Sequence, residues 1–203
     1  MDQLILVINP GSTSTKLGVF RNEIQTHTTS LSHSSQDLAA FDDIAEQKDF
    51  RQEVTVKWLE EVGIPLRSLT AIVARGGLLK PIPGGTYYIN ETMVAELAEG
   101  RYGKHASNLA ALIAFGLSQR LGIPSFIVDP VVVDELQPVA RISGNPQIER
   151  ISISHALNQK AIGQKTAALL GKGYDELNLI VAHLGGGISV GAHRKGRIID
   201  VNQ

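Results

Sequence analysis

The sequence predicts an α/β fold, because short apolar segments typical of buried strands alternate with longer segments of helical periodicity. The expected strands are Leu4–Ile8, Leu17–Phe20, Glu23–Leu31, Thr70–Ala74, Pro124–Val128, Leu177–Ala182 and Arg197–Val201. The expected helices are Asp37–Gln47, Phe50–Glu61, Glu91–Glu99, His105–Leu121 and His155–Leu170. Glycine, a common helix stop, follows four of these helices, as Gly63, Gly100, Gly122 and Gly171.

The composition is that of an ordinary soluble protein. The 203 residues are 43% apolar with a net charge of -1, enough for one domain with a good core, or one and a fraction. The sequence has neither the basic excess of a nucleic-acid-binding protein nor an apolar run of about 18 residues that could span a membrane. Met1-Asp2-Gln3 leads straight into a strand, so we expect no signal peptide. The absence of cysteine excludes disulfides and thiolate chemistry and is compatible with the cytoplasm, where we expect the protein.

The segment Leu4–Phe20 organises the rest of the chain. Its first strand is broken at Asn9-Pro10-Gly11, and a second strand resumes at Leu17. Between them lie four hydroxyl residues and one cation, Ser12, Thr13, Ser14, Thr15 and Lys16. Such a loop can hold an anion with N–H groups, hydroxyls and the lysine charge, although it lacks the GxxxxGK[ST] pattern of a Walker loop. The plain alternative is a solvated hairpin turn.

A second copy of this pattern lies near the end of the sequence. Asn9 matches His183 and Gly11 matches Gly185, each 174 positions later, and Gly186 and Gly187 extend the second loop. Both copies consist of a strand, a small-residue loop, a strand, a charged turn and a strand. Such self-similarity predicts two related halves whose loops clasp the phosphates of one ligand, unless the match is due to chance.

The repeat also predicts an incomplete second half. The first copy precedes about 150 residues, whereas the second is followed by nothing beyond Gln203, and a two-stranded start cannot bury its own faces. We therefore expect a fragment with one complete domain, residues 1–150, and the start of another, residues 151–203.

Five polar residues lie where α/β proteins form ligand sites, at strand ends or helix starts. Arg75 follows a strand beside two glycines and suits a carboxylate or phosphate, although most arginines in loops are surface residues. His105 and Asn108 lie one turn apart at an expected helix start, where anions bind, unless His105 only caps the helix. Asp129 ends a strand and could bind metal or orient a nucleophile, or simply form an Asx-Pro turn. His155 opens another helix.

The histidines without supporting context, interpreted as surface or packing residues, are His27, His33 and His193.

Together, the segments INPGSTSTK, ARGG, GKHASN, IVDPVVVDEL, SHALNQK and HLGGGISVGAH resemble, in this order, the acetate and butyrate kinase family. The PGSTSTK, RGGLL and HLGGGIS versions are similar to the butyrate kinases, since acetate kinases are expected to read NAGSSSLK, HRVVHGG and HLGNG. The resemblance covers the whole chain. It implies the fold of the actin, sugar-kinase and Hsp70 superfamily, a ribonuclease-H-like (actin-like ATPase) mixed sheet with flanking helices.

The resemblance also implies an activity, the reversible transfer of phosphate between ATP and a short-chain carboxylate, giving an acyl phosphate and ADP. Mg²⁺ would be the cofactor, and the full-length protein would be a cytoplasmic homo-oligomer with no nucleic-acid or membrane partner. Residues 1–150 would bind the acyl substrate and contain the first phosphate site. Residues 151–203 would begin the nucleotide-binding domain.

Individual roles follow from the matching motifs. Asn9 would help position the metal, and Asp129 and His155 match the catalytic aspartate and the transition-state-stabilising histidine. Arg75 would hold the substrate carboxylate, with His105 and Asn108 nearby. The expected phosphate-binding residues are Gly11, Ser12, Thr13, Ser14 and Lys16 in the first loop and His183, Gly185, Gly186 and Gly187 in the second.

Several alternatives remain open. The family's second active-site arginine, adenosine-binding motif and late metal-positioning glutamate have no counterpart here, so the chain is either part of such a kinase or an inactive fragment that binds the acyl group. Acetate or a branched acid could replace butyrate, since one methylene discriminates by only ~1–3 kcal/mol. An Hsp70-like or sugar-kinase function is disfavoured by ARGG and KHASN.

From the missing motifs we expect the 203-residue chain by itself to lack ATP affinity and catalysis. The measurement is a hydroxamate assay, which traps acyl phosphate. Butyrate-dependent turnover comparable to that of a full-length enzyme would contradict this expectation.

Overall fold

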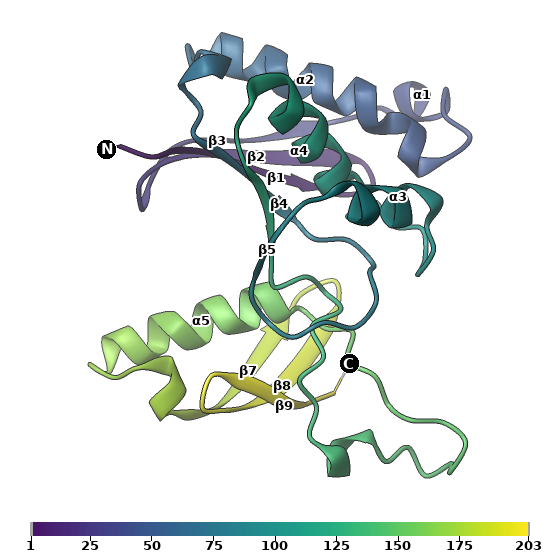
Figure 1. Ribbon diagram of the computed structural model, residues 1–203, viewed down its shortest axis with the longest axis vertical. Helices are drawn as coiled ribbons and strands as arrows, with labels where there is room; N and C mark the ends of the chain where they lie inside the picture. The colour runs from purple at the N-terminus through teal and green to yellow at the C-terminus, as the bar shows by residue number, and fades with distance from the viewer. Residues whose placement is uncertain (1, 203) are drawn as a thin grey trace. The chain divides into compact units, whose positions relative to one another are not determined.

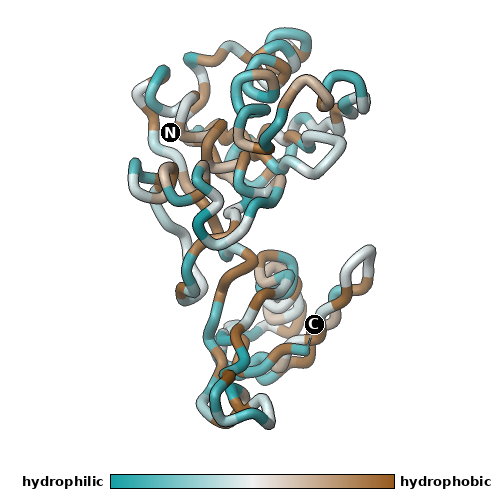
Figure 2. The backbone as a smooth tube through the Cα atoms, turned by 90° about the vertical axis from the view of Figure 1, so that its right-hand side faces the viewer, coloured by the Kyte–Doolittle hydropathy of each residue, from teal (hydrophilic) through white to brown (hydrophobic). Residues whose placement is uncertain are grey.

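The computed structural model describes residues 2–202, and the chain divides into two compact units (Figure 1). Unit 1 comprises the residues up to Leu79 together with Thr86–Val128, and unit 2 comprises Lys80–Gly85 and the residues from Asp129 onward. The chain therefore leaves unit 1 for six residues before it returns. Figure 2 shows hydrophobic stretches interrupted by hydrophilic ones along the backbone of both units.

Unit 1 is built on a six-stranded mixed sheet with the strand order β3-β2-β1-β4-β6-β5. Its strands are β1 (Leu4–Pro10), β2 (Ser14–Arg21), β3 (Ile24–Ser32), β4 (Ala71–Arg75), β5 (Thr86–Tyr88) and β6 (Ser125–Val128). The first three form an antiparallel meander, and β4 and β6 continue the sheet in parallel with β1. The carboxyl ends of β1, β4 and β6 therefore meet at one edge, where α/β proteins bind ligands.

Helices cover this sheet. They are α1 (Ser35–Leu38), α2 (Lys48–Glu61), α3 (Glu91–Glu99) and α4 (Asn108–Leu121). The apolar α4 contacts β1, β4 and β6, and it places Leu109, Ile113 and Leu117 in the core, all fully buried. Helix α2 packs against α4 (Figure 1). Burying a leucine or isoleucine contributes about 1.5–3 kcal/mol, so this stripe is a main source of unit 1 stability.

Unit 2 combines a three-stranded antiparallel sheet with one long helix. The strands are β7 (Asn178–Leu184), β8 (Ile188–Arg194) and β9 (Arg197–Asn202), and α5 (Ala156–Leu169) packs against β7. Its core cluster consists of Val133, Leu136, Ala140, Ala156, Ile198 and Val201. The segment Lys80–Gly85 joins this unit through a parallel bridge between Ile82 and Val133.

The structure supports the predicted internal repeat. Strand β7 begins and ends 174 positions after β1, and a three-residue loop closes each hairpin. Each meander also has a register shift between its second and third strands, at Val19/Phe20 and at Ala192/His193. The turn after the second strand has a residue of positive φ in both copies, Asn22 at 55° and Lys195 at 50°. Similarity at this level of detail goes beyond a shared Gly-rich pattern.

Several predicted elements are confirmed almost to the residue. Helix α3 has the expected bounds, because the Asn90 side chain accepts a hydrogen bond from the Met93 N–H and Gly100 adopts the left-handed conformation at the other end. The helix expected over Phe50–Glu61 begins two residues earlier, at Lys48.

Three local predictions were wrong. The helix expected over Asp37–Gln47 is replaced by the one-turn α1 and a 3₁₀ turn, because Ser34 and Asp43 each start a separate capping box. The helix expected from His105 begins at Asn108, because the His105 ring accepts the Ser107 N–H and the His105 carbonyl accepts the Asn108 N–H, which closes a separate turn before the helix. The broken segment Leu78–Tyr88 contains strand β5 at its end.

The two compact units divide after Val128, whereas the sequence predicts a domain boundary after residue 150; that boundary stays a prediction. Among residues 2–202, no helix has the length and apolar character needed to cross a bilayer.

Candidate functional site

The first loop, Gly11–Thr13, is shorter than the sequence suggests. Ser14 and Thr15 already belong to β2, and the Gly11 N–H donates to the Ser14 carbonyl at 2.7 Å. Ser12 and Thr13 are exposed in the loop. Lys16 is also exposed and pairs with Asn9 across the hairpin, so a cation and an amide lie side by side next to the loop.

A fully buried arginine holds this loop from the protein interior. Arg51, on α2, donates through Nη1 to the carbonyls of Gly11 and Ser14, both at 2.9 Å, and through Nη2 to the Ser12 carbonyl at 3.0 Å. The side chain of Gln47 accepts from Nε and Nη2. Burial lowers the pKa of Arg51 from its ordinary value. The loop carbonyls are thus turned inward toward a positive charge, an arrangement that favours an anion on the outside.

Thr15 also connects Arg51 to a buried histidine. Thr15 Oγ1 accepts from Arg51 Nη1 at 3.1 Å and lies 2.8 Å from His33 Nε2. Burial and the charge of Arg51 lower the pKa of His33. The loop position expected for Thr15 was therefore wrong, because its hydroxyl is used inside unit 1, whereas His33 is a packing histidine as expected.

Arg75 and Asn9 come together at the carboxyl ends of two parallel strands. Ala74 pairs with Ile8, so the next residues along β4 and β1 are Arg75 and Asn9. Arg75 Nη1 donates to Asn9 Oδ1 at 3.4 Å, and both side chains are partly exposed. A guanidinium beside an amide oxygen can bind an anionic oxygen while keeping its orientation.

The structure gives Asn108 a structural function. Its Oδ1 accepts the Leu78 N–H at 2.9 Å, and its Nδ2 donates to the carbonyls of Leu97 and Gly103. The buried amide thus holds the segment that follows Arg75, and its role in substrate binding stays a prediction. His105 is exposed, with Nδ1 2.7 Å from Ser107 Oγ.

In unit 2, Asp129 follows β6 in a positive-φ conformation, at 39°. It exchanges two hydrogen bonds with Gly85, since its Oδ1 accepts the Gly85 N–H at 2.8 Å and its own N–H donates to the Gly85 carbonyl at 2.9 Å. Burial raises the pKa of Asp129, against the opposing effect of the Gly85 hydrogen bond. Glu135 and Lys160 form a buried ion pair at 3.1 Å whose charges also act on Asp129.

Two histidines of unit 2 stack face to face beside the second loop. The rings of His155 and His183 are 3.8 Å apart and 6° from parallel. His155 Nδ1 lies 2.9 Å from Ser189 Oγ, and the Asn158 amide holds His183 Nδ1 at 2.8 Å.

The opposite edges of the two rings face the loop. A Cβ built on Gly187 would lie 3.2 Å from His155 Nε2, and one built on Gly185 would lie 3.3 Å from His183 Nε2. Gly186 has open space around it. The arrangement offers ring nitrogens to an anion held by the loop.

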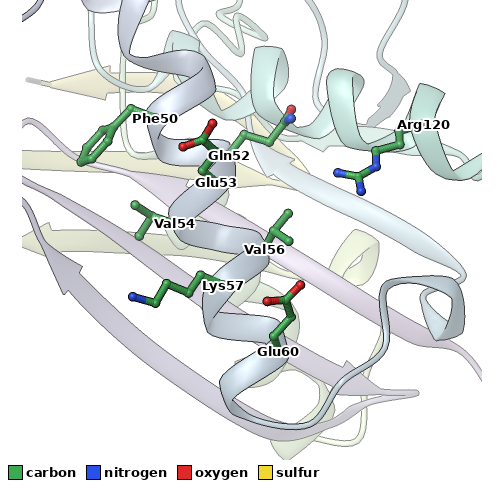
Figure 3. A pocket seen from close by; sticks show the side chains of 8 residues that line it. All are labelled: Phe50, Gln52, Glu53, Val54, Val56, Lys57, Glu60 and Arg120. Carbon is green, nitrogen blue, oxygen red and sulfur yellow. The ribbon is translucent and has the colours of Figure 1, made fainter.

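The hollow shown in Figure 3, of about 470 Å³, belongs to unit 1. Its lining comes mainly from α2, together with Arg120 of α4, and contains none of the predicted site residues. Across residues 2–202, no three His, Cys, Asp or Glu side chains lie together so as to hold a metal ion.

Comparison with known proteins agrees with the motif series. Residues 148–202 match the model of the Acetokinase family. Over 198 residues, 98% of this chain, the sequence is 54% identical to a protein of Listeria innocua named "Probable butyrate kinase". The resemblance to the acetate and butyrate kinase family is confirmed. A Listeria monocytogenes protein of the same name is also 54% identical, and the chain spans 56% of the length of each.

Solved structures confirm the predicted fold class. Acetate kinase from Porphyromonas gingivalis matches 98% of this chain and 57% of its own, with a TM-score of 0.69 and 18% identity. A propionate kinase from Francisella tularensis matches with a TM-score of 0.63 and 20% identity. The chain therefore has the mixed α/β architecture of the actin-like ATPase fold.

Sequence reasoning missed the residues that support the loops from inside. Arg51, Gln159 and Ser189 are fully buried and make hydrogen bonds to loop or site residues. For Gln159 there was a signal, because it follows His155 by four residues and so shares its helix face. For Arg51 there was none, since arginine on a helix usually marks the solvent side.

We predict that Arg51→Met lowers the free energy of unfolding by about 3 kcal/mol, because the carbonyls of Gly11, Ser12 and Ser14 lose a charged donor. Chemical denaturation measures the change. The matched control is Lys57→Met at an exposed position of the same helix, which should stay within about 0.5 kcal/mol of wild type. Equal effects of the two substitutions would contradict the anchoring role.

We predict that Asp129→Asn stabilises the protein at neutral pH. The folded-state pKa is raised, so between the ordinary value and the raised value the folded protein holds a proton that the unfolded chain has lost. The free energy of unfolding therefore falls as pH rises through this window, and the amide removes that loss. The gain should vanish below pH ~3, where the carboxyl is protonated in both states.

The control for this pH series is Asp134→Asn. Burial alone would raise the pKa of Asp134, but hydrogen bonds from Arg141 and two backbone N–H groups lower it overall. Its substitution should therefore destabilise the protein at neutral pH, the opposite sign. Denaturation curves with the same sign for both variants would contradict the assignment.

Proposed function

We propose that the chain takes part in the reversible transfer of the ATP γ-phosphate to a short-chain carboxylate, giving an acyl phosphate and ADP. The observation that carries this proposal is the 54% identity, along 98% of the chain, to proteins named probable butyrate kinases. Butyrate is the substrate we favour, with acetate and branched short acids as alternatives within the same chemistry.

In unit 1, Arg75 binds the substrate carboxylate, and Asn9 holds the guanidinium in place. The carboxylate is ionised at neutral pH, so it can attack phosphorus without a strong base. Lys16 and the N–H groups of Ser12 and Thr13 bind phosphate oxygens, supported by the buried charge of Arg51. His105 is exposed on the same unit and assists substrate binding.

In unit 2, the loop Gly185–Gly187 holds the phosphoryl group, and His155 and His183 donate hydrogen bonds to it. In phosphoryl transfer the protein mainly positions the reactants and neutralises charge on the phosphoryl oxygens, which matches this donor set. Asp129 is the catalytic carboxylate, and Gly85 fixes its orientation.

Mg²⁺ keeps several waters and binds through few protein oxygens together with substrate phosphates, and the amide oxygen of Asn9 in unit 1 would supply one such oxygen. When bound, it would neutralise charge on the phosphates. A cytoplasmic location and a homo-oligomeric full-length protein remain predictions from the family resemblance.

The test places this chain in the Listeria innocua relative, in exchange for its matching 198 residues. A hydroxamate assay should show carboxylate- and ATP-dependent formation of acyl phosphate. Arg75→Met should mainly raise KM for the carboxylate, and His155→Ala should lower kcat about 10²–10³-fold through loss of a transition-state donor.

The unaltered relative and circular dichroism of the chimera are the controls. A folded chimera without carboxylate-dependent turnover, beside an active relative, would rule the proposed function out. A panel of acetate, butyrate and isobutyrate identifies the preferred acid.

A further inference from the structure

A continuous series of hydrogen-bonded side chains leads from the second loop into the interior of unit 2. His155 Nδ1 lies 2.9 Å from Ser189 Oγ, and Gln159 Nε2 donates to that oxygen at 2.8 Å. Gln159 Oε1 lies 2.9 Å from His193 Nε2, and His193 Nδ1 is bonded to the Tyr174 hydroxyl. Ser189 and Gln159 are fully buried, and His193 is nearly so.

The donors and acceptors in this series have one consistent direction. The tyrosine hydroxyl is protonated at neutral pH and donates to His193 Nδ1, because burial raises the pKa of Tyr174. Burial also lowers the pKa of His193 to about 4, so this ring is neutral at pH 7 and has one N–H. That N–H is on Nε2 and donates to Gln159 Oε1. The nearby charges of Lys160 and Glu135 act on His193 in opposite senses.

Gln159 extends this order of donors and acceptors to His155. With its Oε1 accepting from His193, its Nε2 must donate to Ser189 Oγ. The backbone N–H of His155 approaches the same oxygen at 3.5 Å. Since the Ser189 oxygen accepts from these donors, its own hydrogen is directed at His155 Nδ1. A neutral His155 ring then has its proton on Nε2.

Two glycines make room for this arrangement. A Cβ on Gly191 would lie 2.1 Å from Gln159 Oε1, and a Cβ on Gly163 would lie 2.6 Å from the Tyr174 ring. Neither glycine has a positive φ, so close approach accounts for them better than backbone conformation does. The interior of unit 2 is built around the buried amide and the phenol.

We infer that Gln159, His193 and Tyr174 are positioning residues that keep the proton of His155 on Nε2, the edge that faces the loop Gly185–Gly187. His155 then presents an N–H donor to a phosphoryl oxygen. The use of this donor rests on the proposed function, whereas the position of the proton does not.

The decisive variant is Gln159→Glu, which keeps the shape of the side chain but removes its donor. The Ser189 hydroxyl would then donate to the new carboxylate and accept from His155, so the proton should move from Nε2 to Nδ1. Long-range ¹H–¹⁵N NMR of the ¹⁵N-histidine-labelled 203-residue chain reports which ring nitrogen is protonated. Gln164→Glu, exposed on the same helix, is the matched control and should leave His155 unchanged.

The same samples are titrated with inorganic phosphate. Binding followed on the His155 signals should be about tenfold weaker in Gln159→Glu than in the control, since a charged hydrogen bond is lost. Tyr174→Phe, a milder change at the far end, should give a mixture of the two proton positions even if Gln159→Glu fails to fold.

A His155 proton that stays on Nε2 in both Gln159→Glu and Tyr174→Phe would overturn the inference. So would phosphate binding that does not respond when the proton moves. Failure of the chimera to make acyl phosphate would remove the proposed function but would leave the NMR result on the proton position standing.

Discussion

A buried hydroxyl group lies under the loop of each hairpin and connects it to the rest of its unit. Thr15 and Ser189 are the second residues of β2 and β8, 174 positions apart, and both are fully buried. Thr15 joins Arg51 and His33, and Ser189 joins Gln159 and His155. Three small residues have little packing of their own, so each loop takes its position from a helix and a histidine behind it.

The side chains that support the two loops, Arg51 and Gln159, differ in charge. The two loops therefore attract a ligand in different ways. Arg51 places a guanidinium under the first loop and turns the loop carbonyls inward, so attraction there comes from charge. Gln159 is neutral and has both a donor and an acceptor, so it can transmit a hydrogen-bond direction but no charge. The second loop therefore relies on oriented N–H groups from its neighbouring rings.

Much of the fold was predictable because its signals are local. The strands around both loops, helix α3 with its Asn90 and Gly100 ends, and the repeat could all be identified from nearby residues. The single helix expected over Asp37–Gln47 does not form, because Ser34 and Asp43 each cap a separate short turn. The positions of Arg51 and His193 were not predictable, since burying an arginine or a neutral histidine depends on partners distant in the sequence. The burial of these two side chains depends on tertiary contacts, which a local sequence pattern does not reveal.

The paired hydrogen bonds between Gly85 and Asp129 have a consequence for synthesis on the ribosome. Lys80–Gly85 belongs to unit 2, yet its partners Asp129, Val132 and Asp134 are translated only after the rest of unit 1, Thr86–Val128. Because domains tend to fold in the order in which they are made, unit 1 can fold while this six-residue segment still lacks its hydrogen-bond partners. The turn that holds Asp129 can then form only after the chain beyond Val128 has been made.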